Sequence, residues 1–227
     1  MVKPCGNKKN KFMNLINLGS NNSIANQFLA QVRDQEIQAD RMRFRTNMER
    51  LGEIMAYEIS KKLKYEPRSF ETPLKATRIN QLKSQPVLIT VLRAGLPYFQ
   101  GFLNYFDDAD AGFIGAYRKE NAKEIKINLD YLATPGLDGR EVILVDPMLA
   151  TGKSFIRSVN ELLTHGKPKH LHIASLIASP EGIQYINENL KLPYTIWTFS
   201  VDEKLDSRFY IVPGLGDAGD LSYGEKL

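Results

Sequence analysis

The residues best suited to chemistry lie within positions 141–154, which read EVILVDPMLATGKS. Residues 142–145 are all aliphatic, which is typical of a strand buried on both faces, and Asp146 follows where that strand should end. A loop of small residues then leads to a helical pattern that begins at Ser154. The first turn of a helix has unpaired N–H groups and favours a negative charge by roughly 0.3–1 kcal/mol. Because Thr151 and Ser154 add hydroxyl donors, the segment predicts an anion site, most simply for phosphate.

Two kinds of phosphate loop compete for this segment. Gly152-Lys153-Ser154 matches the end of a Walker A loop, but that loop requires a glycine where this chain has Pro147. A loop for phosphoribosyl pyrophosphate (PRPP) fits better, with the acid facing the ribose hydroxyls and the Thr-Gly-x-Ser turn around the 5′-phosphate. An ordinary turn with a capping serine would explain this segment alone, but not the further segments described next.

Four segments together resemble the uracil phosphoribosyltransferases, a type I phosphoribosyltransferase family. VDPMLATGKS, residues 145–154, is similar to the PRPP loop of that family, which usually reads DPMLATGGS. YIVPGLGDAGD, residues 210–220, resembles its uracil-recognition segment. LRAGL, residues 92–96, resembles its pyrophosphate loop, and GAYR, residues 115–118, resembles the start of its flexible arm. The similarity follows the family's order from about Arg33 onward, and it implies transfer of the phosphoribosyl group of PRPP to uracil.

The resemblance also implies roles for individual residues. We expect Arg118, Asp146 and Asp217 to be catalytic. The expected PRPP-binding residues are Arg93, Arg118, Asp146, Pro147, Met148, Leu149, Ala150, Thr151, Gly152, Lys153, Ser154 and Asp217. The expected uracil-binding residues are Ile211, Gly216, Asp217 and Ala218. We expect no direct protein ligand for Mg²⁺, which would be held mainly by PRPP and water.

The chemistry of the reaction fits these residue types. Displacement of pyrophosphate at the ribose C1 builds up positive charge on the sugar, so groups that stabilise the leaving group accelerate it. Arg93 and Arg118 each follow a predicted strand and could bind pyrophosphate oxygens in a bidentate way. Each arginine alone could also be a surface ion-pair residue. Asp146 would bind the ribose hydroxyls, although a single acid at a strand end can also cap a turn.

The glycine-rich segment that contains Gly214 and Gly216 suits recognition of a base. Uracil presents an acceptor, a donor and an acceptor along one edge, and exposed backbone groups can match that pattern. The simpler alternative is a glycine-rich surface turn.

Two departures from the family pattern affect the site. Lys153 replaces the usual second glycine of the PRPP loop, and residues 221–225 read LSYGE instead of the usual Arg-x-Phe-Gly-Thr.

The arrangement of apolar runs predicts an α/β fold with a mainly parallel twisted sheet flanked by helices, as in phosphoribosyltransferases. Predicted strands cover residues 87–92, 112–117, 124–132, 142–145, 171–177 and 194–201. Predicted helices begin near Ile24, Leu96, Ser154 and Ser179, and a turn is expected around Pro67. Residues 121–135 read as a hairpin or β-arm. Residues 1–20 are expected to be a flexible basic leader, and residues 21–227 a single domain with an N-terminal helical layer.

Composition excludes several classes of protein. The 227 residues are 43% hydrophobic and 25% charged, as in ordinary globular enzymes, and contain one cysteine, which argues against a disulfide framework. No apolar run reaches the ~18–20 residues that span a bilayer, so we expect a cytoplasmic protein without membrane contact. Three histidines show no zinc-like spacing. Binding of nucleic acid is not expected, because the lysines that make the chain basic cluster in the leader.

Other hypotheses remain open from the sequence. The same fold could serve a regulator that senses PRPP or UMP and binds RNA, or an enzyme for another base. The intact base segment argues against the first, and the lack of an aromatic residue and a lysine within Pro213–Asp220 argues against purine specificity. Phe44, Met48, Leu51 and Met55 form one stripe of a helix that is either core or a subunit interface. This stripe and the family predict a homodimer or larger oligomer; the sequence has no signal on activation by GTP, which some relatives show.

Overall fold

The computed structural model describes the backbone of residues 14–119 and 126–225, and their side chains apart from residues 116–119 and 126–130. Within these residues, the central sheet has the strand order β1-β11-β9-β7-β4-β5-β6. All neighbouring strands are parallel except β5 and β6. The strands are β1 (Leu15–Asn17), β4 (Val87–Leu92), β5 (Asp110–Lys119), β6 (Lys126–Ala133), β7 (Glu141–Val145), β9 (His170–Ala174) and β11 (Tyr194–Thr198).

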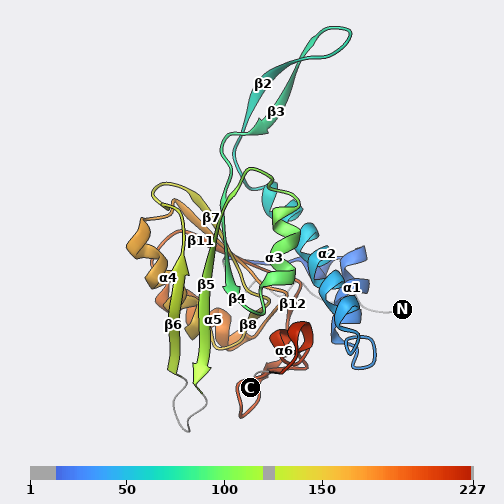
Figure 1. Cartoon of the computed structure of the whole chain (residues 1–227), viewed down its shortest axis with the longest axis vertical. Helices are drawn as coiled ribbons and strands as arrows, with labels where there is room; N and C mark the ends of the chain where they lie inside the picture. The colour runs from blue at the N-terminus through green and yellow to red at the C-terminus, as the bar shows by residue number, and fades with distance from the viewer. Residues whose placement is uncertain (1–13, 120–125, 226–227) are drawn as a thin grey trace, which may run out of the picture.

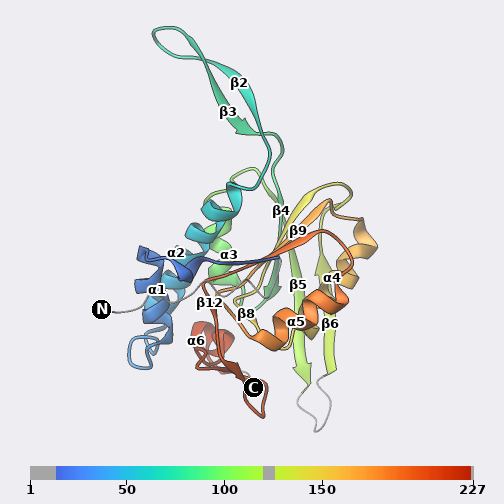
Figure 2. The ribbon, with the colours of Figure 1, turned by 180° about the vertical axis from the view of Figure 1, so that it is seen from behind.

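Helices cover both faces of this sheet, as Figure 1 and the reverse view in Figure 2 show. One face carries α1 (Ile24–Arg33), α2 (Arg41–Ser60) and α3 (Leu96–Leu103), and the other carries α4 (Lys153–Leu162) and α5 (Pro180–Asn189). A short helix, α6 (Ala218–Tyr223), lies beyond the carboxyl ends of the parallel strands, low in Figure 1. The predicted α/β class, with its parallel sheet and N-terminal helical layer, is confirmed. No helix of the described residues is long and apolar enough to cross a membrane.

Strand β7 explains why the sheet has two cores. Val142 and Leu144 pack into the cluster beneath α4 and α5, whereas Ile143 and Val145 pack into the cluster beneath α2 and α3. All four side chains are fully buried. A strand covered on both faces needs an unbroken aliphatic run, and this run is what predicted it from the sequence.

The N-terminal helices form as the sequence predicts. The Ser23 hydroxyl caps α1 by accepting the N–H of Ala25 at 3.3 Å. The four apolar residues of the α2 stripe (Phe44, Met48, Leu51 and Met55) are at most 1% exposed and belong to the core on the α2 and α3 side. The stripe is therefore core, and it carries no argument for a subunit interface.

The flexible leader expected over residues 1–20 extends too far toward the C-terminus. Residues 15–17 form β1, which pairs in parallel with β11 through Leu15 and Ile196, Ile16 and Trp197, and Asn17 and Thr198. These apolar side chains add an edge strand to the sheet, so residues 15–20 belong to the folded body. Residues 1–13 lie outside the described part of the chain.

The expected turn around Pro67 is wrong. Pro67 lies within β2 (Tyr65–Glu71), which pairs antiparallel with β3 (Ala76–Leu82). This hairpin projects from the body at the end of the molecule opposite α6 (Figures 1 and 2). Almost all of its residues are exposed, and the segment has no buried apolar pattern that would have predicted strands. From here on, the name β-arm refers to residues 65–82, which are a different segment from the arm expected at residues 121–135.

Other strand predictions need adjustment at their ends. The hairpin or arm expected at residues 121–135 is not separate from the main sheet: β6 pairs antiparallel with β5 and forms the edge of that sheet. The connection at residues 120–125 lies outside the described residues. The two long strands expected at 171–177 and 194–201 each break into two. Their second halves, β10 (Ile177–Ala178) and β12 (Ser200–Val201), leave the main sheet and join β8 (Met148–Leu149) in a separate small parallel sheet.

Candidate active site

The order of the strands creates a site between β4 and β7. From β4 the chain continues through α3 to β5 on one side, whereas from β7 it continues through α4 to β9 on the other. Ligands of open α/β sheets bind beyond the carboxyl ends of strands at such a reversal. The two strand ends are tied together by the buried Thr90 hydroxyl, which donates to the Val145 carbonyl at 3.1 Å.

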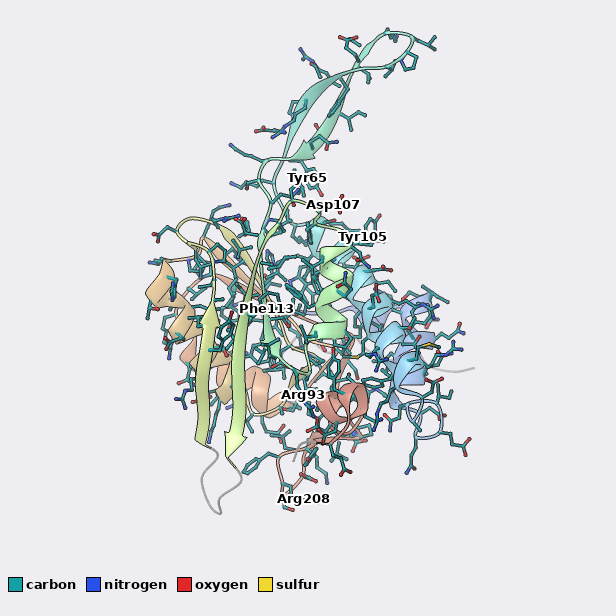
Figure 3. The ribbon with its side chains drawn as sticks, viewed as in Figure 1. Tyr65, Arg93, Tyr105, Asp107, Phe113 and Arg208 are labelled. Atoms are coloured by element: carbon teal, nitrogen blue, oxygen red, sulfur yellow. The ribbon has the colours of Figure 1, made fainter. Side chains whose placement is uncertain are left out.

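The loop after β4 contains Arg93 and Gly95 and fits tightly against β7. A Cβ on Gly95 would lie 2.2 Å from Thr90 Oγ1 and 3.2 Å from the Val145 carbonyl oxygen, so glycine is required. Arg93 Nη2 donates to Asp220 Oδ1 at 2.7 Å and to the Gly224 carbonyl at 2.6 Å. Figure 3 shows Arg93 between the strand ends and α6. The loop therefore connects the sheet edge to the C-terminal segment.

The loop after β7 presents an open helix N-terminus. Asp146 Oδ1 accepts the N–H of Met148 at 3.3 Å. Gly152 has φ +74°, a left-handed conformation that glycine adopts without strain, and α4 begins directly after it. The N-cap residue Gly152 has no side chain to cap α4, and the N–H of Lys153 makes a long hydrogen bond of 3.4 Å to Thr151 Oγ1. The N-terminus of α4 is therefore suited to an anion. Thr151 and Ser154 are half-buried and Lys153 is exposed at this turn.

This anion loop, residues 146–154, is held by the segment that leads into α5. The Ser179 hydroxyl donates to the Ala150 carbonyl at 2.6 Å, and β8 pairs with β10. A Cβ on Gly182 would lie 2.2 Å from the Ala150 carbonyl oxygen and one on Gly152 would lie 2.8 Å from that of Gly182. The sequence identified Ser179 only as a helix cap and did not single out Gly182, because nothing local links them to residue 150.

The predicted base segment, residues 210–220, reaches the Arg93 loop at its C-terminal end. Ile211 begins β14 (Ile211–Val212), which pairs with β13 (Lys204–Leu205), and its side chain is 4% exposed. Gly216 has φ +96°. Asp217 caps α6, with Oδ1 accepting the N–H groups of Gly219 at 2.8 Å and Asp220 at 3.0 Å. A hollow of about 370 Å³ opens beside Gly216 and Asp217.

Arg93 and α6 are direct neighbours. A Cβ on Gly219 would lie 3.8 Å from both Arg93 Nε and the Ala94 Cβ. The carboxylate that pairs with Arg93, Asp220, is 127 positions away in the sequence and was not predicted as a site residue. The Arg93 loop thus contacts the end of β7 on one side and the base segment on the other.

The remaining predicted site residues fall into two groups. The side chains of Pro147, Leu149 and Ala150 are buried, so these residues can reach a ligand only through the backbone; that of Met148 is half-buried. Arg118 lies in β5, next to β4, and its backbone pairs with Ile127; its side chain is outside the described part. Ala218 is 1% exposed at the start of α6.

The described residues contain no group of three or more His, Cys, Asp or Glu side chains that could hold a metal ion by themselves. The site does place carboxylate oxygens of Asp146 and Asp217 at its loops, and such oxygens are the ligands that Mg²⁺ prefers. This donor set fits an ion that arrives with a polyanionic substrate and keeps several waters.

A mainly parallel sheet with an open helix N-terminus and an arginine loop at its reversal point is the arrangement expected of a phosphoribosyltransferase. A model of the uracil phosphoribosyltransferase family matches residues 19–224. The uracil phosphoribosyltransferase of Porphyromonas gingivalis is 49% identical over 216 residues, covering 95% of this chain and 100% of that protein. That of Methanococcus maripaludis is 37% identical over 194 residues, with coverages of 84% and 83%. The solved structure of the AQ2163 protein from Aquifex aeolicus superposes with a TM-score of 0.82 at 33% identity, covering 92% of this chain and 98% of that one.

The chain therefore belongs to the uracil phosphoribosyltransferase family. The resemblance inferred from four short segments is confirmed over nearly the whole chain. Both relatives carry the name of the enzyme, which favours an enzyme over an RNA-binding regulator on the same fold.

Proposed function

We propose that the protein catalyses the reaction of uracil with PRPP to give UMP and pyrophosphate. A bond forms between N1 of uracil and C1 of the ribose, the C1–O bond to pyrophosphate breaks, and N1 loses its proton. The observation that carries this proposal is the position of the Arg93 loop. It lies against the end of β7, where the anion loop begins, and its arginine is bonded to α6, where the base segment ends.

The anion loop is suited to the phosphoribosyl end of PRPP. The 5′-phosphate would accept N–H groups of the first turn of α4 and the hydroxyls of Thr151 and Ser154. The left-handed Gly152 turns the backbone into α4, and without a Cβ it can pack against the Gly182 carbonyl. Asp146, at the end of β7, would bind the ribose hydroxyls. Pro147, Met148, Leu149, Ala150 and Lys153 would contribute through the backbone.

The leaving pyrophosphate would be bound by Arg93 and Arg118. They follow or lie in adjacent strands, β4 and β5, so both can serve one polyanion. Arg93 is half-buried and uses Nη2 for Asp220 and Gly224, so binding of pyrophosphate would use its other nitrogens or exchange these partners. Stabilising the charge that develops on a leaving group is commonly the largest catalytic contribution.

Uracil would lie against Ile211, Gly216, Asp217 and Ala218. The glycine and the tight turn leave backbone N–H and C=O groups open to the edge of the base. Asp217 lies next to Gly219, where the base segment meets Arg93, and its negative charge would stabilise the ribose carbon that becomes positive. Mg²⁺ bound with PRPP would neutralise the charge of the pyrophosphate, and Asp146 and Asp217 are the residues that would hold its waters.

The β-arm supports an oligomer. A hairpin of two strands is marginally stable alone in water, and this one exposes Tyr65, Phe70, Leu74 and Ile79 by 46%, 39%, 95% and 53%. We expect these side chains to contact a second copy of the chain in a homodimer or larger assembly. A cytoplasmic location fits the single cysteine and the charged substrate PRPP.

The reaction is tested by incubating the protein with PRPP, Mg²⁺ and labelled uracil, with cytosine, hypoxanthine and orotate in parallel. Conversion of uracil alone to its nucleotide is the expected result. Turnover of another base instead would contradict the assignment of residues 211–218. No turnover by folded protein that still binds PRPP would favour the regulator, and RNA binding would then be measured.

A further inference from the structure

The carboxylate of Asp202 is buried next to the base segment and is fully bonded. Its side chain is 2% exposed. Arg33, at the end of α1, donates to both oxygens, Nη1 at 2.9 Å and Nη2 at 2.8 Å, and the Ser200 hydroxyl donates at 2.7 Å. The fourth donor is the N–H of Gly214 at 2.9 Å. Burial raises the pKa of Asp202, but the hydrogen bonds from Arg33, Ser200 and Gly214 outweigh it, so the net pKa lies below its ordinary value.

The same pair holds the turn inside the base segment from both sides. Arg33 Nη1 also donates to the Gly214 carbonyl at 3.2 Å, so both backbone polar groups of Gly214 are held. Gly214 has φ +63°, and a Cβ there would lie 2.1 Å from the Ile211 carbonyl oxygen. This turn therefore sets the direction in which the chain passes from Ile211 to Gly216.

A second contact anchors the next residue to the same helical layer. With its amide nitrogen turned toward them, Gln38 donates to the carbonyls of Val32 and Leu215, at 2.9 Å each. Leu215 is 3% exposed, which leaves the turn little freedom. Among the described residues, the side-chain hydrogen bonds of Arg33 and Asp202 join each other, Ser200 and Gly214, and none reaches the Arg93 loop or the anion loop.

We propose that Arg33 and Asp202 are positioning residues for the base: they hold the Gly214 turn so that Ile211 and residues 216–218 present their backbone groups to uracil. This inference rests on the proposal that residues 211–218 bind the base. A bidentate arginine is suited to the task, because its planar fork fixes both the distance and the orientation of the carboxylate. Loss of the Arg33–Asp202 pair should therefore weaken uracil binding and spare PRPP binding, because the contacts that would bind PRPP lie on other loops.

The test compares the kinetics of Arg33→Lys and Ser200→Ala with the unaltered enzyme. Lysine keeps the charge but cannot hold both oxygens, and alanine removes one of the four donors. We expect Arg33→Lys to raise the KM for uracil roughly tenfold, with kcat at saturating uracil and the KM for PRPP within about threefold; such a pattern marks loss of ground-state binding. Ser200→Ala should raise the KM for uracil by a smaller factor.

The matched control is Arg140→Lys. Arg140 pairs with Asp110, at the other end of the sheet where β5 and β7 begin. The same substitution there should leave both KM values unchanged. Asp202→Asn is a stronger test if it folds, but removing one partner of a buried pair leaves the other unpaired, so the two milder variants decide if it does not fold.

Several outcomes would overturn the inference. A lower melting temperature with an unchanged KM for uracil would make the pair a structural brace only. Equal rises in both KM values would show general damage. Ala218→Val separates this inference from its premise. If that variant raises the KM for uracil and Arg33→Lys does not, the base segment is correct and the positioning role is wrong. If neither does, the base segment itself is misassigned.

Discussion

Lys153 is the residue that most clearly departs from the usual loop of the family, and its position indicates a small effect. It is exposed, it is the first residue of α4, and its N–H lies 3.4 Å from Thr151 Oγ1. An anion at this turn would be bound by the N–H, which every residue except proline provides. We expect Lys153→Gly to keep kcat/KM within about tenfold, or about 1.4 kcal/mol.

Steady-state kinetics with varied PRPP would measure this effect. Activity reduced to background in folded Lys153→Gly would show that the ammonium group itself binds the substrate. Thr151→Val provides the comparison, because it removes a hydroxyl that we assign to the phosphate.

A substitution at Asp217 can separate the effect of its negative charge from its role as the N-cap of α6. Its Oδ1 accepts two N–H groups at the start of α6, and asparagine can accept the same bonds. Asp217→Asn should therefore fold normally and lose turnover by on the order of a hundredfold, because the negative charge near the reacting carbon is gone. Circular dichroism and kcat measured on the same preparation would check both parts. A normal kcat would remove Asp217 from the catalytic residues.

At the scale of elements, a cluster of polar and aromatic side chains lies where β7 and β9 begin. This is the end of the sheet opposite the active site. His172 Nδ1 accepts the Trp197 indole N–H at 3.1 Å, and its Nε2 lies 3.7 Å from Glu141 Oε2. The neighbouring His172 lowers the pKa of Glu141, partial burial opposes this, and Lys169 adds to the lowering, so the pKa is about 2. His172 thus has a structural setting.

The lowered pKa makes a prediction about acid stability. Glu141 has an ordinary pKa of 4.5, so its ionised form stabilises the fold fully above that pH and loses the contribution as the pH falls toward 2. Glu141→Gln should be less stable than the unaltered protein at neutral pH, with the difference shrinking between about pH 4.5 and 2. Urea unfolding at several pH values would test this, with the exposed Glu161→Gln as control. A difference that stays constant with pH would contradict the role of the charge.

The elements that could be predicted from the sequence are those whose apolar spacing or capping residues reflect how they are buried and how they begin. The run of β7, the cap at Ser23 and the Ser179-Pro180 start of α5 each reflect a local physical requirement. The β-arm was missed because its residues face water and carry no burial pattern. The anion loop was found by its motif. The pairs Arg93–Asp220 and Arg33–Asp202 were not, since their members are 127 and 169 positions apart and only the fold brings them together.

At the scale of the whole molecule, the β-arm and the active site lie at opposite ends of the sheet (Figure 3, where Tyr65 and Arg93 are labelled). Replacing residues 66–81 with a short glycine linker should leave the central sheet intact, because β2 pairs only with β3 among the described strands. If the exposed apolar side chains of the arm contact a second copy, this variant should be smaller in light scattering than the full chain. An unchanged mass, or a full-length protein that is already a monomer, would contradict the role of the arm.

The central claim is that the anion loop, the Arg93 loop and the base segment form one site for a uracil nucleotide. A crystal structure of the protein with UMP tests it most directly. The account predicts the phosphate of UMP at the first turn of α4, the ribose hydroxyls at Asp146, and the uracil edge against Ile211 and residues 216–218. Binding of UMP with its phosphate at Arg93, or with its base away from residues 211–218, would contradict it.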